Sequence, residues 1–246
     1  MTFHQILHIE FIKLFRRSNI LFFFLMIYVL NSPVYRATAA VREQPMMLSS
    51  AFFEIVTGST LAIFGMLLLA IFMVNSIGNE FNEGSYRKSI AAGLKKSSFF
   101  YGKLFLILIP TLLIIFWILL TYSLLGIFAY DYSISNLLQG INIIKTLHVG
   151  IALYYAGLLG LFFISVFRNR TIGLVFFPFW FVPEFFLTVF SLTGRINIPH
   201  DFLPGAAGWQ LFTSNGFEPK YLAIVALYSA ICIIASFLAL RLREEK

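Results

Sequence analysis

The sequence predicts an all-α integral membrane protein, and three observations support this prediction. Hydrophobic residues make up 59% of the 246 residues and charged residues only 12%, which is unlike a soluble domain. Apolar runs recur along the chain, and several exceed the roughly 20 residues that a helix needs to cross a bilayer. The charged residues gather in the segments between these runs. The chain is therefore expected to form a single transmembrane domain over residues 1–246.

The apolar runs predict six membrane-spanning helices. The first is the weakest, because Asn31, Ser32 and Pro33 interrupt it. The second and third flank the longest charged segment of the chain, and the sixth ends at a basic C-terminal tail. The predicted spans cover residues 20–36, 51–77, 104–130, 146–167, 171–192 and 221–240.

The distribution of basic residues predicts the orientation of these spans. With the N-terminus inside, thirteen of the eighteen Lys and Arg residues fall in inner segments and five in outer ones. Cytoplasmic loops carry such an excess, so both termini are expected to be cytoplasmic. The same bias explains the net charge of +7, because the basic residues flank apolar runs. The charge therefore does not indicate a nucleic acid partner.

The N-terminal segment predicts an amphipathic helix in the membrane interface. Phe3, Leu7, Phe11 and Leu14 recur at helical spacing, with charged residues on another face. A secretory signal peptide is the alternative, since 37–39 reads Ala-Thr-Ala after an apolar core. The long segment ahead of that core favours the interfacial helix.

The charged segment at 78–103 predicts a short helix between two spans. Ser85 is a candidate N-cap, Gly93 can end the helix, and the residues around Ser97 form a turn from which the next helix runs into the membrane. Tyr86, Ile90 and Leu94 share one face of this helix at i, i+4 and i+8. A solvated basic loop that anchors the spans to anionic lipid headgroups is the alternative reading.

These residues carry a resemblance to a known family. The order is an acidic residue, Gly-Ser, Arg-Lys, a small apolar stretch, a basic-Ser turn and Gly-Lys at the next span. It is similar to the permease subunits of the type-2 (ABC-2) family of ATP-binding-cassette transporters. In this chain the pattern reads Glu80 and Glu83, Gly84-Ser85, Arg87-Lys88, Ile90-Ala91-Ala92, Lys96-Ser97 and Gly102-Lys103. The N-terminal Glu10–Arg17 segment also resembles that family. Family members often have Pro in the turn, where this chain has Leu94-Lys95-Lys96.

The resemblance implies a transport subunit that is not itself an enzyme. The short helix would be a coupling helix seated in a groove of a separate cytoplasmic ATPase. The residues expected to make this contact are Glu80, Glu83, Tyr86, Arg87, Lys88, Ile90 and Leu94, with Tyr86, Ile90 and Leu94 as the inserted face. Mg-ATP would bind that partner, since this chain has no Gly-x-x-x-x-Gly-Lys-Ser/Thr phosphate loop and needs no cofactor of its own.

The resemblance also implies a second permease subunit, identical or different, and a bacterial cytoplasmic (inner) membrane with its lipid. ATP hydrolysis by the partner would drive export of a hydrophobic or amphipathic substrate, such as an antimicrobial peptide, a lipid or a drug. A secondary transporter or channel is the main alternative function, and an intramembrane enzyme is a weaker one. The lack of an internal repeat and of matched catalytic side chains counts against both.

Two further features lie in the C-terminal half. Glu184 follows Pro178 and Pro183 in the fifth predicted span, where an ionised carboxylate needs a partner or water. Contact with substrate on the transport route and a hydrogen bond between helices are both open for it. The outer segment 193–220 mixes Pro and Gly with apolar residues. We expect it to re-enter the membrane as a short hairpin, the alternative being a surface loop anchored by Trp209.

Overall fold

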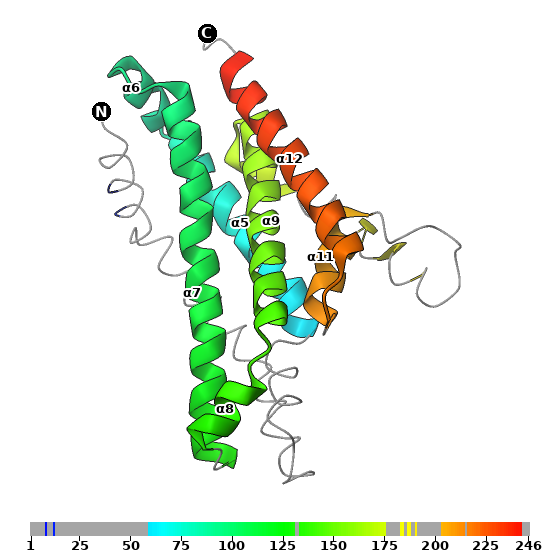
Figure 1. Ribbon diagram of the computed structural model, residues 1–246. Helices are drawn as coiled ribbons and strands as arrows, with labels where there is room; N and C mark the ends of the chain where they lie inside the picture. The colour runs from blue at the N-terminus through cyan, green and yellow to red at the C-terminus, as the bar shows by residue number, and fades with distance from the viewer. Residues whose placement is uncertain are drawn as a thin grey trace.

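The computed structural model describes most of the chain as a bundle of helices (Figure 1). The described residues are 59–130, 133–175, 203–214 and 216–242, with His8, Ile12, Pro183, Glu184, Phe186, Leu187 and Phe190. No strand occurs among them, which confirms the predicted all-α class. The main helices are α5 (Ser59–Asn82), α6 (Ser85–Ala91), α7 (Lys96–Tyr130), α8 (Ile134–Gly140), α9 (Ile143–Phe167), α11 (Pro204–Thr213) and α12 (Pro219–Leu242).

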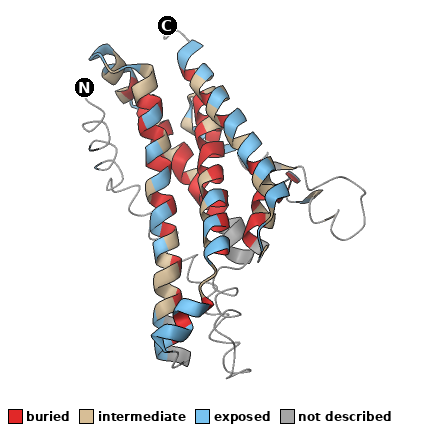
Figure 2. Ribbon diagram, viewed as in Figure 1, coloured by how far each residue is buried: buried red, intermediate tan, exposed pale blue. Residues whose placement is uncertain are grey.

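Helix α9 is the centre of the bundle and contacts α5, α7, α11 and α12. Its residues are apolar on every side, the pattern of a helix that is surrounded by other helices or by lipid. Small residues allow its neighbours to approach closely. At Gly160, for example, a Cβ atom would lie 2.5 Å from the carbonyl oxygen of Ala70 on α5. Most residues of α9 are therefore buried within the described bundle (Figure 2).

Contacts along α9 fix the directions of its neighbours. Helix α5 runs parallel to α9, since Met66 lies near Tyr155 and Met73 near Gly160. Helix α12 also runs parallel to α9, because Arg168 at the end of α9 bonds carbonyls at the end of α12. The chain therefore returns to the opposite end of the bundle between α9 and α12. This return falls where the fifth span is predicted, a segment that is largely outside the described residues.

Three of the described helices are long and apolar enough to cross a membrane by length and composition: α7, α9 and α12. They match the predicted spans at 104–130, 146–167 and 221–240. Helix α5 begins at Ser59 and overlaps the predicted span at 51–77. The span at 20–36 lies outside the described residues, as does the N-terminal interfacial helix except for His8 and Ile12, which are helical and exposed. The count of six remains a prediction.

Helix α7 is longer than a single span requires. Its 35 residues extend about 52 Å at 1.5 Å per residue, against about 30 Å of hydrocarbon. At its far end Tyr122 donates a hydrogen bond to the carbonyl oxygen of Leu137 at 3.2 Å, which holds α8 against it. Helix α6 and the C-terminal end of α12 lie at the opposite end of the bundle (Figure 1).

Candidate functional site

Helix α6 is held between two glycines with left-handed backbone. Gly84 has φ 69° and occupies the cap position before the helix, so Ser85 is its first residue and the prediction of Ser85 as N-cap is wrong. The Ser85 hydroxyl donates instead to the carbonyl oxygen of Glu80 at 3.2 Å. At the other end Gly93 has φ 91°, and its N–H donates to the carbonyl oxygen of Ile90. The N–H of Leu94 donates to the carbonyl oxygen of Ser89. These two bonds form a Schellman motif, so Gly93 ends the helix as predicted.

Tyr86 points into the bundle and not away from it. Its ring lies 5.0 Å from Phe81 of α5 and 4.7 Å from Phe99 of α7, both in edge-to-face arrangements, and only 2% of the residue is exposed. Ile90 and Leu94 also pack against the core. The apolar face of α6 thus lies on this chain's own helices, and this changes which side of α6 is available to a partner.

The Glu80 side chain is also turned inward. Lys103 Nζ on α7 lies 2.6 Å from Glu80 Oε1 on α5, and both side chains are buried. Lys103 also lies over the Phe99 ring, 4.8 Å from its centroid. The pair joins the two helices that flank α6. Glu80 is therefore part of the structural junction beneath α6, whereas Glu83 is exposed beside it.

Arg168 connects this junction to the end of α12. It follows α9 with φ 50°, a left-handed conformation that is uncommon for residues other than Gly. Its guanidinium donates to the carbonyl oxygens of Ala239 and Leu240 at 3.2 and 3.3 Å, which neutralises the negative end of α12. It also lies within 6 Å of the Phe81 and Tyr86 rings, at 5.9 and 5.8 Å. One side chain thus contacts α5, α6 and α12.

A second arginine ties the same turn to α5. Arg170 donates to Asn79 Oδ1 at 3.0 Å, and a Cβ atom on Gly78 would lie 2.7 Å from the Arg170 Cβ. Arg168 and Arg170 are two of the thirteen basic residues that predict the orientation of the spans, but their contacts were not predicted from the sequence. No local pattern identified them, because their partners lie 71 to 91 positions away in the sequence.

The exposed side of α6 consists of basic residues and small residues. Arg87 and Lys88 are exposed on the helix, and Lys95 is exposed in the turn that follows it. Between them Ala91 and Ala92 leave the backbone accessible. We call the exposed residues Arg87, Lys88, Ala91, Ala92 and Lys95 the α6 outer face. Of the residues predicted to touch a partner, Arg87 and Lys88 are on this face.

Glu184 lies far from α6, at the N-terminus of α11. Its Oε1 accepts hydrogen bonds from the N–H of Gly205 and, at 3.3 Å, from that of Ala206. The carboxylate is 7% exposed. These N–H groups belong to the first turn of α11 and have no partner within that helix. Of the two roles that the sequence left open, this geometry favours a hydrogen bond between segments.

Helix α11 itself falls within the segment predicted to be re-entrant. Its Ala206, Ala207, Leu211 and Phe212 are buried, and it contacts α5, α9 and α12. His148 on α9 lies 3.3 Å from the Ser214 hydroxyl just after α11, which secures the other end of this helix. The described part of 193–220 is therefore a packed helix; its depth in a membrane remains a prediction.

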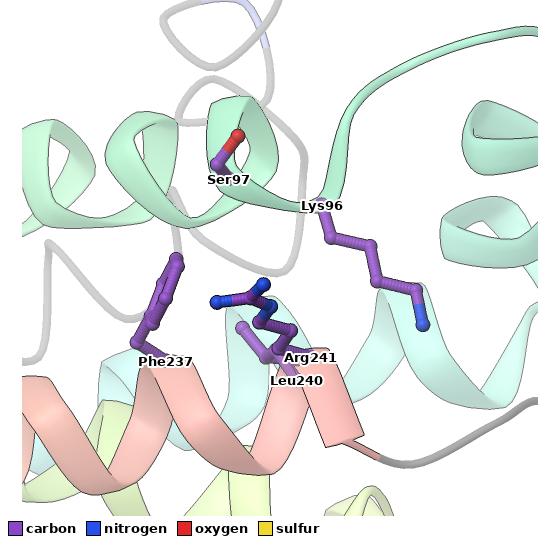
Figure 3. A pocket seen from close by; sticks show the side chains of 5 residues that line it. All are labelled: Lys96, Ser97, Phe237, Leu240 and Arg241. Carbon is purple, nitrogen blue, oxygen red and sulfur yellow. The ribbon is translucent and has the colours of Figure 1, made fainter.

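A pocket of about 330 Å³ opens between the start of α7 and the end of α12. It is lined by Lys96, Ser97, Phe237, Leu240 and Arg241. Figure 3 shows Ser97 on one side of the space and Phe237 and the Arg241 guanidinium on the other, with the Ser97 hydroxyl turned away from them and Lys96 at the edge. Within the described segments, no three His, Cys, Asp or Glu residues come together as a metal site would require.

Comparison with known proteins does not assign the chain to a family. No protein-family model matches it, and no curated protein matches it either. The resemblance to ATP-binding-cassette permeases is therefore still a prediction from the sequence motifs.

Proposed function

We propose that this chain is the membrane subunit of an ATP-driven exporter and that α6 couples it to a separate ATPase. The observation that carries the proposal is the α6 outer face. A short helix with exposed Arg and Lys crosses between α5 and α7 at one end of the bundle, while its apolar face is fixed to the bundle. An acidic groove of a partner could bind this exposed basic side, and a displacement of α6 would then be transmitted to the bundle.

The contacts beneath α6 would transmit such a displacement. Tyr86 is packed between Phe81 and Phe99, so a displacement of α6 has to move the ends of α5 and α7. Arg168 contacts the same rings and the end of α12, which extends the connection across the bundle. Closely packed elements transmit displacement because interiors have little free volume. A partner bound to α6 would therefore act on α5, α7, α9 and α12 together.

In this proposal ATP and Mg²⁺ bind the partner ATPase, and a second permease subunit completes the transport route. The exported compound would be hydrophobic or amphipathic. Both termini, α6 and the turn at 168–170 would lie in the cytoplasm of a bacterial cell, as the distribution of basic residues predicts.

Charge reversal on the α6 outer face tests the proposal. The tagged chain is isolated from its native membrane, and the ATPase that copurifies is quantified by protein mass spectrometry and ATP hydrolysis. The double variant Arg87→Glu, Lys88→Glu should reduce the amount of copurified ATPase more than ten-fold, because like charges would face each other across the contact. Lys220→Glu is the control, since Lys220 is an exposed cation at the start of α12, the opposite end of that helix from its junction with α6.

The double variant should still insert and keep its thermal unfolding midpoint, because both residues are exposed. If the wild-type chain brings down no ATPase, or if the double variant retains as much as Lys220→Glu does, the proposed coupling is wrong. A substrate gradient that drives transport without ATP would favour a secondary transporter.

A further inference from the structure

The pocket between α7 and α12 has the chemistry of a phosphate site at a membrane surface. Arg241 brings a guanidinium from the last turn of α12, and Lys96 brings an ammonium from the first turn of α7. Ser97 also lines the pocket, and its backbone N–H lies in the first turn of α7, where such groups lack helical partners. Phe237 and Leu240 form the apolar wall. Two cations and the N–H groups of a first helical turn around one cavity match a phosphate group.

Two kinds of negative group near the pocket have partners of their own. Glu80 is paired with Lys103, and the carbonyl oxygens of Ala239 and Leu240 accept hydrogen bonds from Arg168. Arg168 therefore cancels the negative end of α12 immediately beside Arg241. The two charged side chains that line the pocket are both cations, so an anion would be attracted there.

Two apolar stripes run away from this pocket along the helices that form it. On α7 the exposed Tyr101, Phe105, Leu108 and Leu112 follow Ser97 on the same face. On α12 the exposed Leu238, Ile234, Ile231 and Leu227 follow Arg241 in the same way. Each stripe is about 16 Å long at 1.5 Å per residue, which matches the roughly 15 Å that one leaflet contributes to the hydrocarbon core.

We propose that this pocket binds the phosphate of an anionic phospholipid, whose acyl chains lie along the α7 and α12 stripes. The stripes favour a lipid over a free phosphate or a soluble phosphate ester, because neither of these would cover them. A zwitterionic lipid offers the same phosphate with a cationic group beside it, and Arg241 and Lys96 disfavour that cation. The site thus selects for net negative charge in the headgroup.

Lipid binding to the purified, delipidated full-length chain tests the proposal. Native mass spectrometry in a non-ionic detergent measures the apparent affinity for phosphatidylglycerol and for phosphatidylcholine. Arg241→Gln and Lys96→Gln should each weaken phosphatidylglycerol binding about five-fold, as expected for one surface cation, and leave phosphatidylcholine binding unchanged. Arg241→Lys keeps the charge and should stay within about two-fold of the wild type. Lys95→Gln is the matched control, since Lys95 is an exposed neighbour that does not line the pocket.

Millimolar inorganic phosphate distinguishes the two sources of the anion. It should fail to displace phosphatidylglycerol if the acyl chains contribute to binding. Full displacement by phosphate would overturn the lipid assignment in favour of a soluble anion. Equal losses in Lys95→Gln and Arg241→Gln, or no preference of the wild type for phosphatidylglycerol, would overturn the site itself. None of these readouts depends on an ATPase, so the result is independent of the proposed function.

Discussion

Lys103 on α7 donates a hydrogen bond to Glu80 on α5 at 2.6 Å, and neither side chain is exposed beyond 6%. Removing one partner would leave a buried charge without its counterion, which typically costs about 3–5 kcal/mol. We expect Lys103→Met and Glu80→Met each to lower the unfolding midpoint in detergent strongly. Differential scanning fluorimetry of the purified variants measures this.

The double variant separates charge pairing from packing. With Met at both positions no charge remains buried, and replacing a buried ion pair by apolar residues is often neutral or stabilising. The double variant should therefore recover most of the stability that each single variant loses. Losses that simply add would show that the two side chains are not coupled.

Close packing between α5 and α9 gives a second prediction. A Cβ at position 160 would lie 2.5 Å from the Ala70 carbonyl oxygen and 3.0 Å from Met73 Cβ, so Gly160→Ala should push the helices apart. Overpacking of this kind costs about 1–3 kcal/mol. Gly150→Ala is the matched control on the same helix, because its Cβ would meet only the end of the Ile115 side chain. A thermal midpoint equally lowered in both variants would contradict this account of the interface.

The third prediction concerns the sides of the membrane. Lys95 follows α6, and Gly216 precedes α12 at the opposite end of that helix; both are exposed. In a Cys232→Ser background, a cysteine at 216 should react with an impermeant thiol reagent in intact cells. A cysteine at 95 should react only after the membrane is opened. Labelling at 95 in intact cells would reverse the orientation deduced from the basic residues.

The helices could be predicted from the sequence because they depend on local properties. Apolar length identified α7, α9 and α12, and Gly93 identified the end of α6. The role of each helix face was harder to predict. Periodicity correctly placed Tyr86 and Ile90 on one side, but it does not specify whether that side meets a partner or the chain's own helices. Tyr86 packs on Phe81 and Phe99 of this chain, and this inward packing was not expected from the sequence; the contact of α6 with a partner is still a prediction.

The least predictable contacts join segments that are distant in sequence. Arg168 reaches carbonyls about 70 residues further along, and Glu184 reaches the N–H groups of α11. A backbone carbonyl or N–H is present in every helix end and gives no sequence signal. For Glu184 the sequence could therefore indicate only that a carboxylate within an apolar run needs a partner.

Glu184 provides the last prediction, because its contact with α11 distinguishes a structural role from a place on the transport route. Its carboxylate accepts from Gly205 and Ala206 at the N-terminus of α11. Glu184→Gln keeps an oxygen that can accept these bonds but loses the charge that favours a helix N-terminus, a loss of about 0.3–2 kcal/mol. Glu184→Leu leaves the N–H groups without an acceptor, which adds about 1–3 kcal/mol. The midpoint of thermal unfolding should therefore fall slightly in the first variant and clearly in the second.

Gly205→Ala tests the same contact from the other side. Its Cβ would lie 3.0 Å from Glu184 Oε1, so the carboxylate would have to shift away from the helix end. If Glu184 acts as a cap, this variant should resemble Glu184→Leu in stability, and adding Gly205→Ala to Glu184→Leu should cost little more. If Glu184 contacts a transported compound instead, Glu184→Gln would change transport at unaltered stability. Gly205→Ala and Glu184→Leu would then have independent effects.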